Sequence, residues 1–153
     1  MRWYHAYMLY RASVLDVKQG RVSTRYGYLV VVMQHYPRFV KKDLIHEYLR
    51  VLAPEKGLFT EFKALARQVQ DHNRAFAEIN YEQRFEISLD GRDELARLGE
   101  MAASRDVYLI CQCASLERCH ADLLLLFARL RYGANAQTPR LSYPIFEKRL
   151  LEE

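Results

Sequence analysis

The sequence predicts a single α/β domain with a mainly parallel sheet, and two observations carry this prediction. Apolar, strand-like segments alternate with segments of helical periodicity, which is typical of strands joined by crossover helices. The chain of 153 residues has the length of one domain and shows no internal repeat, low-complexity tract or linker. We therefore expect one domain over residues 1–153, in a three-layer, Rossmann-like arrangement.

Four segments have the character of strands. His5–Tyr10 is a mixed aromatic and aliphatic stretch that we take as the first strand, and Tyr28–Met33 is rich in β-branched and aromatic residues. Tyr81–Ile87 alternates apolar and charged residues with a period of two, which predicts a half-exposed strand. Asp106–Cys111 is almost continuously apolar, as expected for a strand covered on both faces.

Helices are expected where apolar residues recur at spacings of three and four. The expected helical segments are residues 41–52, 58–73, 94–104, the stretch between 115 and 133, and 144–151. Pro54 ends the first, because a residue before proline avoids the helical region. Ser115 as N-cap and Gly133 as C-cap bound the fourth. Residues 11–26 and 134–142 are predicted as loops or irregular segments.

The composition is that of an ordinary globular protein, with half of the residues hydrophobic and 27% charged. The net charge of +4 comes mainly from arginine, which suits contacts with phosphate or carboxylate, but no basic run is dense enough to mark a nucleic-acid footprint. The first residues lack the apolar stretch of a signal peptide, and no apolar run could span a bilayer. We expect a cytoplasmic protein with no membrane contact. Leu123–Leu130 predicts a buried helix, with a homodimer face as the alternative.

The most informative stretch holds all three cysteines, at the junction between an apolar strand and the next helix. Cys111 ends the strand, and Cys119 and His120 fall in the expected first helical turn. Ligands of open α/β sheets bind beyond the carboxyl ends of the strands, and a helix N-terminus favours anions and thiolates. We therefore expect a pocket for an anionic small molecule or nucleotide in a thiol- or acid–base-dependent enzyme. Cys111, Cys119 and His120 are the candidate catalytic residues, and Arg118 and Ser115 are candidate ligand-binding residues.

Two other interpretations of these cysteines remain open. They are small enough to fill space between strand and helix, with His120 making one structural hydrogen bond. Alternatively, Cys111, Cys113, Cys119 and His120 form a chemically valid zinc set. The spacing argues against zinc, because adjacent Cys119 and His120 on a helix would point about 100° apart. We expect no metal and no cofactor.

A third interpretation is sulfur transfer, because the loop Cys113–Arg118 resembles the active-site loop of rhodaneses, where a cysteine persulfide lies in a cradle of backbone amides. The glycine usual in that loop is absent, and Leu116 stands near its position. A non-catalytic module that binds nucleic acid or protein is the remaining alternative. Its eleven tyrosines could stack bases beside arginines, although they follow no recognisable RNA-binding pattern.

Three pieces of the chain, spanning about residues 27–130, resemble the bacterial and archaeal family called domain of unknown function 488. That family has a strand ending in Leu-Leu-Cys, seven variable residues and Cys-His-Arg, a strand leading to an aromatic-Pro-Arg step, and a Glu-Trp-Leu…Leu-Ala-Pro segment. The matching residues are Leu109-Ile110-Cys111 with Cys119-His120, Gly27 with Leu29–Val32 and Tyr36-Pro37-Arg38, and Glu47-Tyr48-Leu49 with Leu52-Ala53-Pro54. The resemblance implies an α/β domain in a cytosolic prokaryotic protein, and it favours Cys111, Cys119 and His120 over Cys113 as the reactive site.

The chain departs from the family pattern at several positions. Ala121 stands where the family has Arg after Cys-His, Met33-Gln34 replace a frequent Asp-Arg pair, and Cys113 stands where a charged residue is common. These departures imply a diverged member with a partly altered pocket, and loss of the family's activity is the alternative.

Arg38 is the remaining expected ligand-binding residue, together with Tyr36 from the same aromatic-Pro-Arg step. It follows a proline just past a predicted strand and could therefore reach the sheet edge where Cys111 lies. The alternative is that Arg38 pairs with Asp43 or Glu47.

Overall fold

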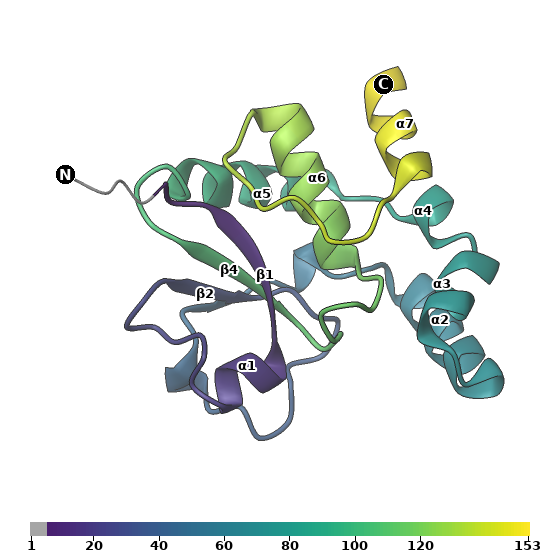
Figure 1. Ribbon diagram of the computed structural model, residues 1–153, viewed down its shortest axis with the longest axis horizontal. Coiled ribbons are helices and arrows are strands. Elements are labelled where there is room, and N and C mark those ends of the chain that lie inside the picture. Colours follow the sequence, from purple (N-terminus) through teal and green to yellow (C-terminus); the bar gives the residue numbers. More distant parts are fainter. Residues whose placement is uncertain (1–5) are drawn as a thin grey trace.

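The protein is built on a four-stranded sheet in which all strands run parallel (Figure 1). The computed structural model describes residues 6–153. The strands are β1 (Leu9–Ser13), β2 (Tyr28–Val31), β3 (Glu47–Tyr48) and β4 (Val107–Cys111), in the spatial order β1-β4-β2-β3. Helices flank this sheet, and the predicted single α/β domain is confirmed.

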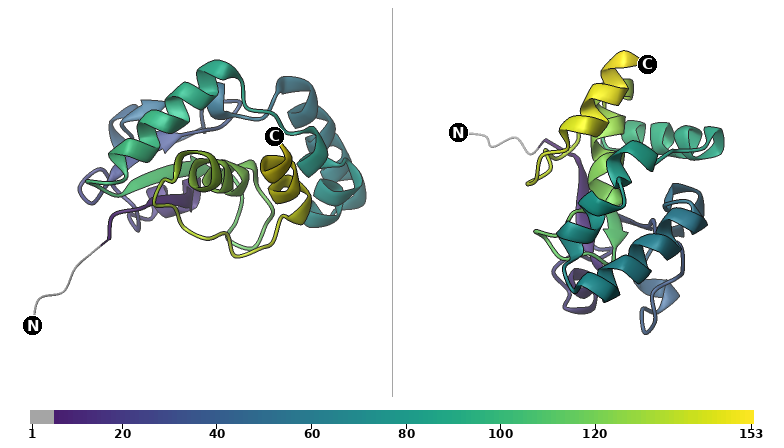
Figure 2. Two further views of the ribbon diagram at one scale, coloured as in Figure 1. Left: turned by 90° about the horizontal axis from the view of Figure 1, so that it is seen from above. Right: turned by 90° about the vertical axis from the view of Figure 1, so that its right-hand side faces the viewer.

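Seven α-helices and two short 3₁₀ turns are present in residues 6–153 (Figures 1 and 2). They are α1 (Val14–Lys18), α2 (Lys56–Val69), α3 (His72–Glu78), α4 (Tyr81–Arg84), α5 (Leu89–Met101), α6 (His120–Tyr132) and α7 (Pro144–Glu152), with η1 (Lys42–Leu44) and η2 (Arg50–Leu52). None of these helices is both long enough and apolar enough to cross a lipid bilayer.

Successive residues of the strands point to opposite faces of the sheet and enter two apolar clusters. Val30 and Leu109 join the larger cluster, which residues of the helices from α2 to α7 complete. Val31 and Ile110 join the smaller one, which Val14 and its neighbours in α1 complete. In Figure 1, α1 accordingly lies on the opposite side of the strands from α5 and α6. The continuous apolar run of β4 reflects burial on both faces, as predicted.

The prediction of a helix over residues 41–52 is wrong. This segment instead forms η1, the edge strand β3 and η2. The His46 amide donates to the Leu29 carbonyl at 2.9 Å, and the Leu49 amide donates to the Val31 carbonyl at the same distance. Pairing with β2 satisfies the backbone groups that a helix would have satisfied internally, so the tertiary context overrides the apolar spacing.

The strand expected over Tyr81–Ile87 is also wrong, because this segment begins with the short helix α4. Asn80 enters the helix in the left-handed conformation, with φ at 58°. Tyr81 and Phe85 are both buried, and they are four residues apart. This spacing places two side chains on the same face of a strand and also on the same face of a helix. The period of two was therefore compatible with a helix.

Other differences concern boundaries. The first strand begins at Leu9 rather than at His5, which lies outside the described residues, and α1 occupies part of the expected 11–26 loop. The long helix over 58–73 is divided, because Gln70 adopts a φ of 54° and Asp71 caps α3. Helix α6 has Cys119 rather than Ser115 as its N-cap.

Candidate functional site

The candidate site lies at the carboxyl edge of the sheet, where the chain leaves β2 and β4 and enters α6. A cavity of about 560 Å³ opens there. Met33 and Gln34 after β2, Cys111 at the end of β4, and Cys119 and His120 at the start of α6 all line it. Four aromatic side chains from α2, α3 and α4 form a further part of its wall, namely Phe59, Phe62, Phe76 and Tyr81. The sheet edge predicted for ligand binding therefore carries a real cavity.

Three thiols meet at this cavity. The Sγ atoms of Cys111, Cys113 and Cys119 all lie within 4.8 Å of one another, a spacing that one metal ion could bridge. The convergence arises because Cys111 ends a strand, while Cys119 is the extended N-cap of α6 and accepts a hydrogen bond from the Ala121 amide at 3.5 Å. All three cysteines are free, and Cys111 and Cys119 are buried.

The three thiols differ in acidity because they share their protons. Hydrogen bonds from the Cys113 and Cys119 thiols, together with the positive charge of Arg11, hold the pKa of Cys111 well below its ordinary value despite burial. The hydrogen bond that Cys113 gives to Cys111 raises the pKa of Cys113. Burial raises the pKa of Cys119, and its neighbours Cys111 and Cys113 raise it further. The cluster therefore concentrates thiolate character on Cys111.

His120 faces this cluster as a neutral base. Its Nε2 lies 2.6 Å from the Val32 carbonyl oxygen and must donate to it, because a carbonyl only accepts. The Nδ1 atom is then unprotonated, and it lies 3.7 Å from Cys119 Sγ. Burial lowers the pKa of His120, which favours the neutral ring. The predicted grouping of Cys111, Cys119 and His120 is thus present in space.

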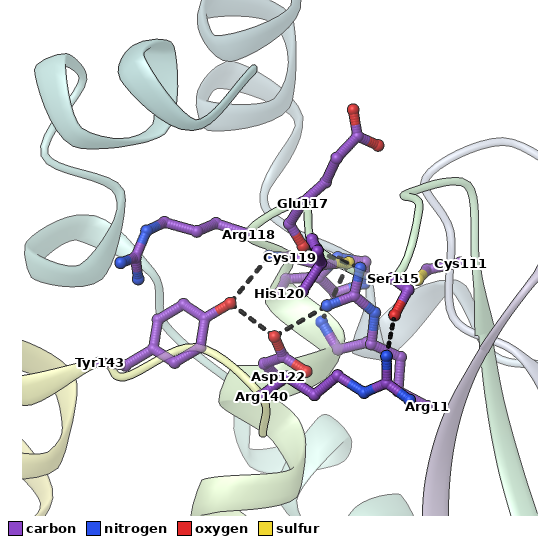
Figure 3. Close-up of polar contacts among 12 residues, drawn as sticks. Arg11, Cys111, Ser115, Glu117, Arg118, Cys119, His120, Asp122, Arg140 and Tyr143 are labelled. Atoms are coloured by element: carbon purple, nitrogen blue, oxygen red, sulfur yellow. Dashed lines mark hydrogen bonds and ion pairs between the residues drawn. The ribbon is translucent and has the colours of Figure 1, made fainter. Parts of the chain in front are cut away.

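Arg11 of β1 is a site residue that the sequence did not reveal. Its guanidinium donates to Asp122 Oδ2 and to the Glu117 carbonyl, each at 2.8 Å. Figure 3 shows the Tyr143 hydroxyl between Asp122 and Cys119: it donates to Asp122 Oδ2 at 2.5 Å and accepts from the Cys119 amide at 3.2 Å. Burial raises the pKa of Asp122 against the opposing influence of Arg11. This buried network connects Arg11 and Tyr143, which lie near the two ends of the described chain, with the loop Cys113–Arg118, called the cysteine loop below.

His72 is a second site residue that the sequence does not reveal, because the apolar spacing predicts it inside the long helix over residues 58–73. It begins α3, and its Nε2 donates to the Arg118 carbonyl at 2.7 Å. Its Nδ1 lies 3.6 Å from Glu117 Oε2. The side chains of His72, Cys113 and Glu117 form a second group whose ligand atoms lie within 4.8 Å of one another.

Two of the expected ligand-binding residues, Arg118 and Ser115, belong to the loop Cys113–Arg118 itself. Arg118 lines the main cavity, but it also donates to the Ser142 carbonyl at 2.6 Å and covers the Tyr143 ring. Ser115 instead lines a second, smaller cavity of about 240 Å³. There its Oγ accepts a hydrogen bond from Arg140 at 2.9 Å (Figure 3). The two residues do not face one common hollow.

The other two expected ligand-binding residues line neither of these cavities. Tyr36 packs edge-on against Tyr48 in the smaller apolar cluster, and its buried hydroxyl has no hydrogen-bond partner among residues 6–153. Arg38 is exposed, and within the described chain no ion pair joins it to Asp43 or Glu47. The structure therefore does not bring this pair to the thiol cluster.

Two backbone amides of the Cys113–Arg118 loop are already used within the protein. The Ala114 amide donates to Glu117 Oε1, and the Arg118 amide donates to Asn73 Oδ1, each at 2.7 Å. A rhodanese-like cradle requires loop amides directed at the ligand, and these two are directed at side chains instead.

Comparison with known proteins adds one finding. Residues 13–130 match the family model DUF488-N3a, which is described as the active DUF488-N3 subclade. No curated protein and no solved structure gives a significant match.

Proposed function

Because the chain belongs to the DUF488 family, in its active DUF488-N3 subclade, we propose that it is a thiol-dependent enzyme that acts on a small anionic molecule of nucleotide type. In this proposal Cys111 is the nucleophile, and Cys119 and His120 assist it. The observation that carries the proposal is the convergence of three free thiols at a cavity of about 560 Å³. The absence of disulfides among the described cysteines also suits a cytoplasmic location.

Cys111 is the thiol whose surroundings best support nucleophilic attack. Two neighbouring thiols and Arg11 stabilise its ionised form, and the thiolate is the reactive species of cysteine. His120 receives, through the Cys119 thiol, the proton that Cys111 gives up, since Nδ1 lies 3.7 Å from Cys119 Sγ. The sulfur then forms a bond to an electrophilic atom of the substrate. The bond to the leaving group breaks, and that group departs with the electron pair and takes a proton from solvent.

The wall of the cavity supports a flat, anionic substrate. Phe59 is the half-buried aromatic side chain of the lining, and its ring can contact a planar group such as a nucleobase. Lys63 and Arg118 bring two positive charges to the lining, against the one carboxylate of Glu117. A nucleoside monophosphate has both the ring and the charge that this lining favours.

The test is alkylation of the reduced, folded protein with iodoacetamide, followed by peptide mass spectrometry across a pH series. We expect Cys111 to be modified first, with a half-maximal rate at a lower pH than for a free cysteine, because its thiolate is stabilised. Nucleoside monophosphates at millimolar concentration should slow this reaction, whereas inorganic phosphate should slow it less.

Cys113→Ser and Cys111→Ser provide the matched pair of variants. Cys113 is the more exposed thiol, and its replacement should leave alkylation at Cys111 in place, whereas Cys111→Ser should abolish the fast reaction. If Cys113 alone reacts in the folded wild type and Cys111 stays inert, the proposed nucleophile is excluded.

A further inference from the structure

We infer that Cys111, Cys113 and Cys119 together form a binding site for one soft divalent cation, Zn²⁺, and that the bound ion blocks the thiol chemistry proposed above. The binding site stands on the arrangement of the three sulfur atoms alone. Only the blocking effect rests on the proposed function.

The sulfur positions suit one central ion. All three Sγ atoms lie within 4.8 Å of one another. A zinc–sulfur bond is about 2.3 Å long, so two thiolates on one tetrahedral ion are about 3.8 Å apart. The sulfurs therefore need to approach by at most about 1 Å, which small side-chain rotations can supply. Thiolates are soft ligands that select zinc over magnesium and calcium.

The surroundings suit the charge of the loaded site. Three thiolates around Zn²⁺ carry a net charge of −1, and the thiol protons still present on the cluster leave to solvent as the ion enters. Arg11 brings a positive charge to the cluster, shared with the Asp122 carboxylate, because its guanidinium is fixed to Asp122 Oδ2 and to the Ala114 and Glu117 carbonyls of the loop that holds Cys113. Cys111 and Cys119 are 1% and 2% exposed, so little water has to be displaced from two of the three sulfurs when the ion binds.

The fourth coordination position falls on the side of Cys113, the half-buried member of the cluster. All three cysteines and His72 line the same cavity, from which water can reach the ion. His72 Nδ1 faces Glu117 Oε2 at 3.6 Å, so this imidazole is engaged with the carboxylate and the fourth position is left to water. Three fixed ligands and one exchangeable position form a zinc site that can be loaded and emptied.

The experiment begins with protein that has been treated with a chelator and a phosphine reductant. Zn²⁺ is titrated in competition with a chromophoric chelator, and Cd²⁺ is titrated while the ultraviolet thiolate-to-cadmium charge-transfer absorption is followed. We expect one ion per chain, with an absorption intensity corresponding to three thiolates. Each of Cys111→Ser, Cys113→Ser and Cys119→Ser should weaken Zn²⁺ binding by more than about tenfold, because loss of even a second-shell partner costs a metal site about 10- to 100-fold. Gln112→Ala, at the exposed position between two of the ligands, is the control and should bind Zn²⁺ as the wild type does.

The intensity of the thiolate-to-cadmium absorption of the wild-type protein tests the site even if a serine variant fails to fold. Absence of stoichiometric binding, an intensity of one thiolate, or Zn²⁺ affinity that survives all three substitutions would overturn the site. Alkylation of Cys111 separates the two proposals: inert Cys111 in metal-free protein that still binds Zn²⁺ removes the nucleophile and leaves the cation site. Equal alkylation rates with and without one equivalent of Zn²⁺ would overturn the blocking effect.

Discussion

Tyr143 connects the C-terminal segment to the thiol cluster through a single buried hydroxyl. This group donates to Asp122 and accepts from the Cys119 amide, and the side chain is fully buried. Tyr143→Phe leaves a buried amide without a partner and removes one of the groups that stabilise the Asp122 carboxylate. We expect the free energy of unfolding, measured by urea denaturation, to fall by about 1–3 kcal/mol.

The control for this change is Tyr132→Phe. Tyr132 is 40% exposed, and its hydroxyl makes one hydrogen bond, to the Arg92 carbonyl. Because water can replace that partner, the control should lose much less stability. Equal losses in the two variants would mean that the buried hydroxyl has no special role.

The same residues show how far a sequence can identify a site. Cys111, Cys119 and His120 could be predicted because a strand end and a helix start lie close together in the chain. Arg11 and His72 could not, because their partners Asp122 and Arg118 are 111 and 46 residues away in sequence. Only the fold brings such pairs together, and no local pattern marks them in advance.

At the level of elements, the correct predictions rest on sequence patterns that fit only one type of structure. The apolar run of β4 must be covered on both faces, and Gly133 ends α6 because it adopts the left-handed conformation, with φ at 64°. The errors at β3 and α4 arose where a spacing fits two structures. There the neighbouring strand β2, or the aromatic core around Tyr81, decides the outcome.

The edge strand β3 is held by the side chain of Glu47 as well as by its backbone. Glu47 pairs with Arg97 of α5 at 2.8 Å and accepts a hydrogen bond from Tyr28 of β2. Partial burial alone would raise its pKa, but these partners lower it below the ordinary value of 4.5. In the folded state the carboxylate therefore stays ionised at a lower pH than in the unfolded state, so its contribution to stability is present above pH 4.5 and is lost as the pH falls through the lower folded pKa.

We expect Glu47→Gln to lower the free energy of unfolding by about 0.5–1 kcal/mol at pH 7, a value discounted because Arg97 is 41% exposed. The difference from wild type should shrink as the pH falls below 4.5, when measured by urea denaturation at each pH. Glu100→Gln, at an exposed position of helix α5, which also carries Arg97, is the control and should leave the free energy of unfolding at pH 7 close to the wild-type value. A difference that stays constant down to acidic pH would contradict the assigned role.

At the level of the whole molecule, the site depends on segments from the beginning, middle and end of the chain. Arg11 comes from β1, His72 from α3, and Tyr143 from the segment just before α7. Figure 1 shows α7 beside α4, where Arg149 donates to the Phe85 carbonyl at 3.0 Å. The backbone at Cys119 is therefore held by the segment that leads into the C-terminal helix as well as by the cysteine loop.

Phe146 is the main anchor of that helix, since it is 2% exposed and packs against Phe85 with ring centroids 6.0 Å apart. Phe146→Ala should lower the free energy of unfolding by about 3–5 kcal/mol. It should also accelerate alkylation of the buried Cys119 in the absence of denaturant, because undocking of α7 releases Tyr143 and exposes the cluster, and thiol modification reports the population of such open states. Ile145→Ala, at a neighbouring position that is 40% exposed, should change neither quantity by a comparable amount. A Phe146→Ala protein that is less stable in urea yet alkylates Cys119 at the wild-type rate would show that the cluster is closed without help from α7.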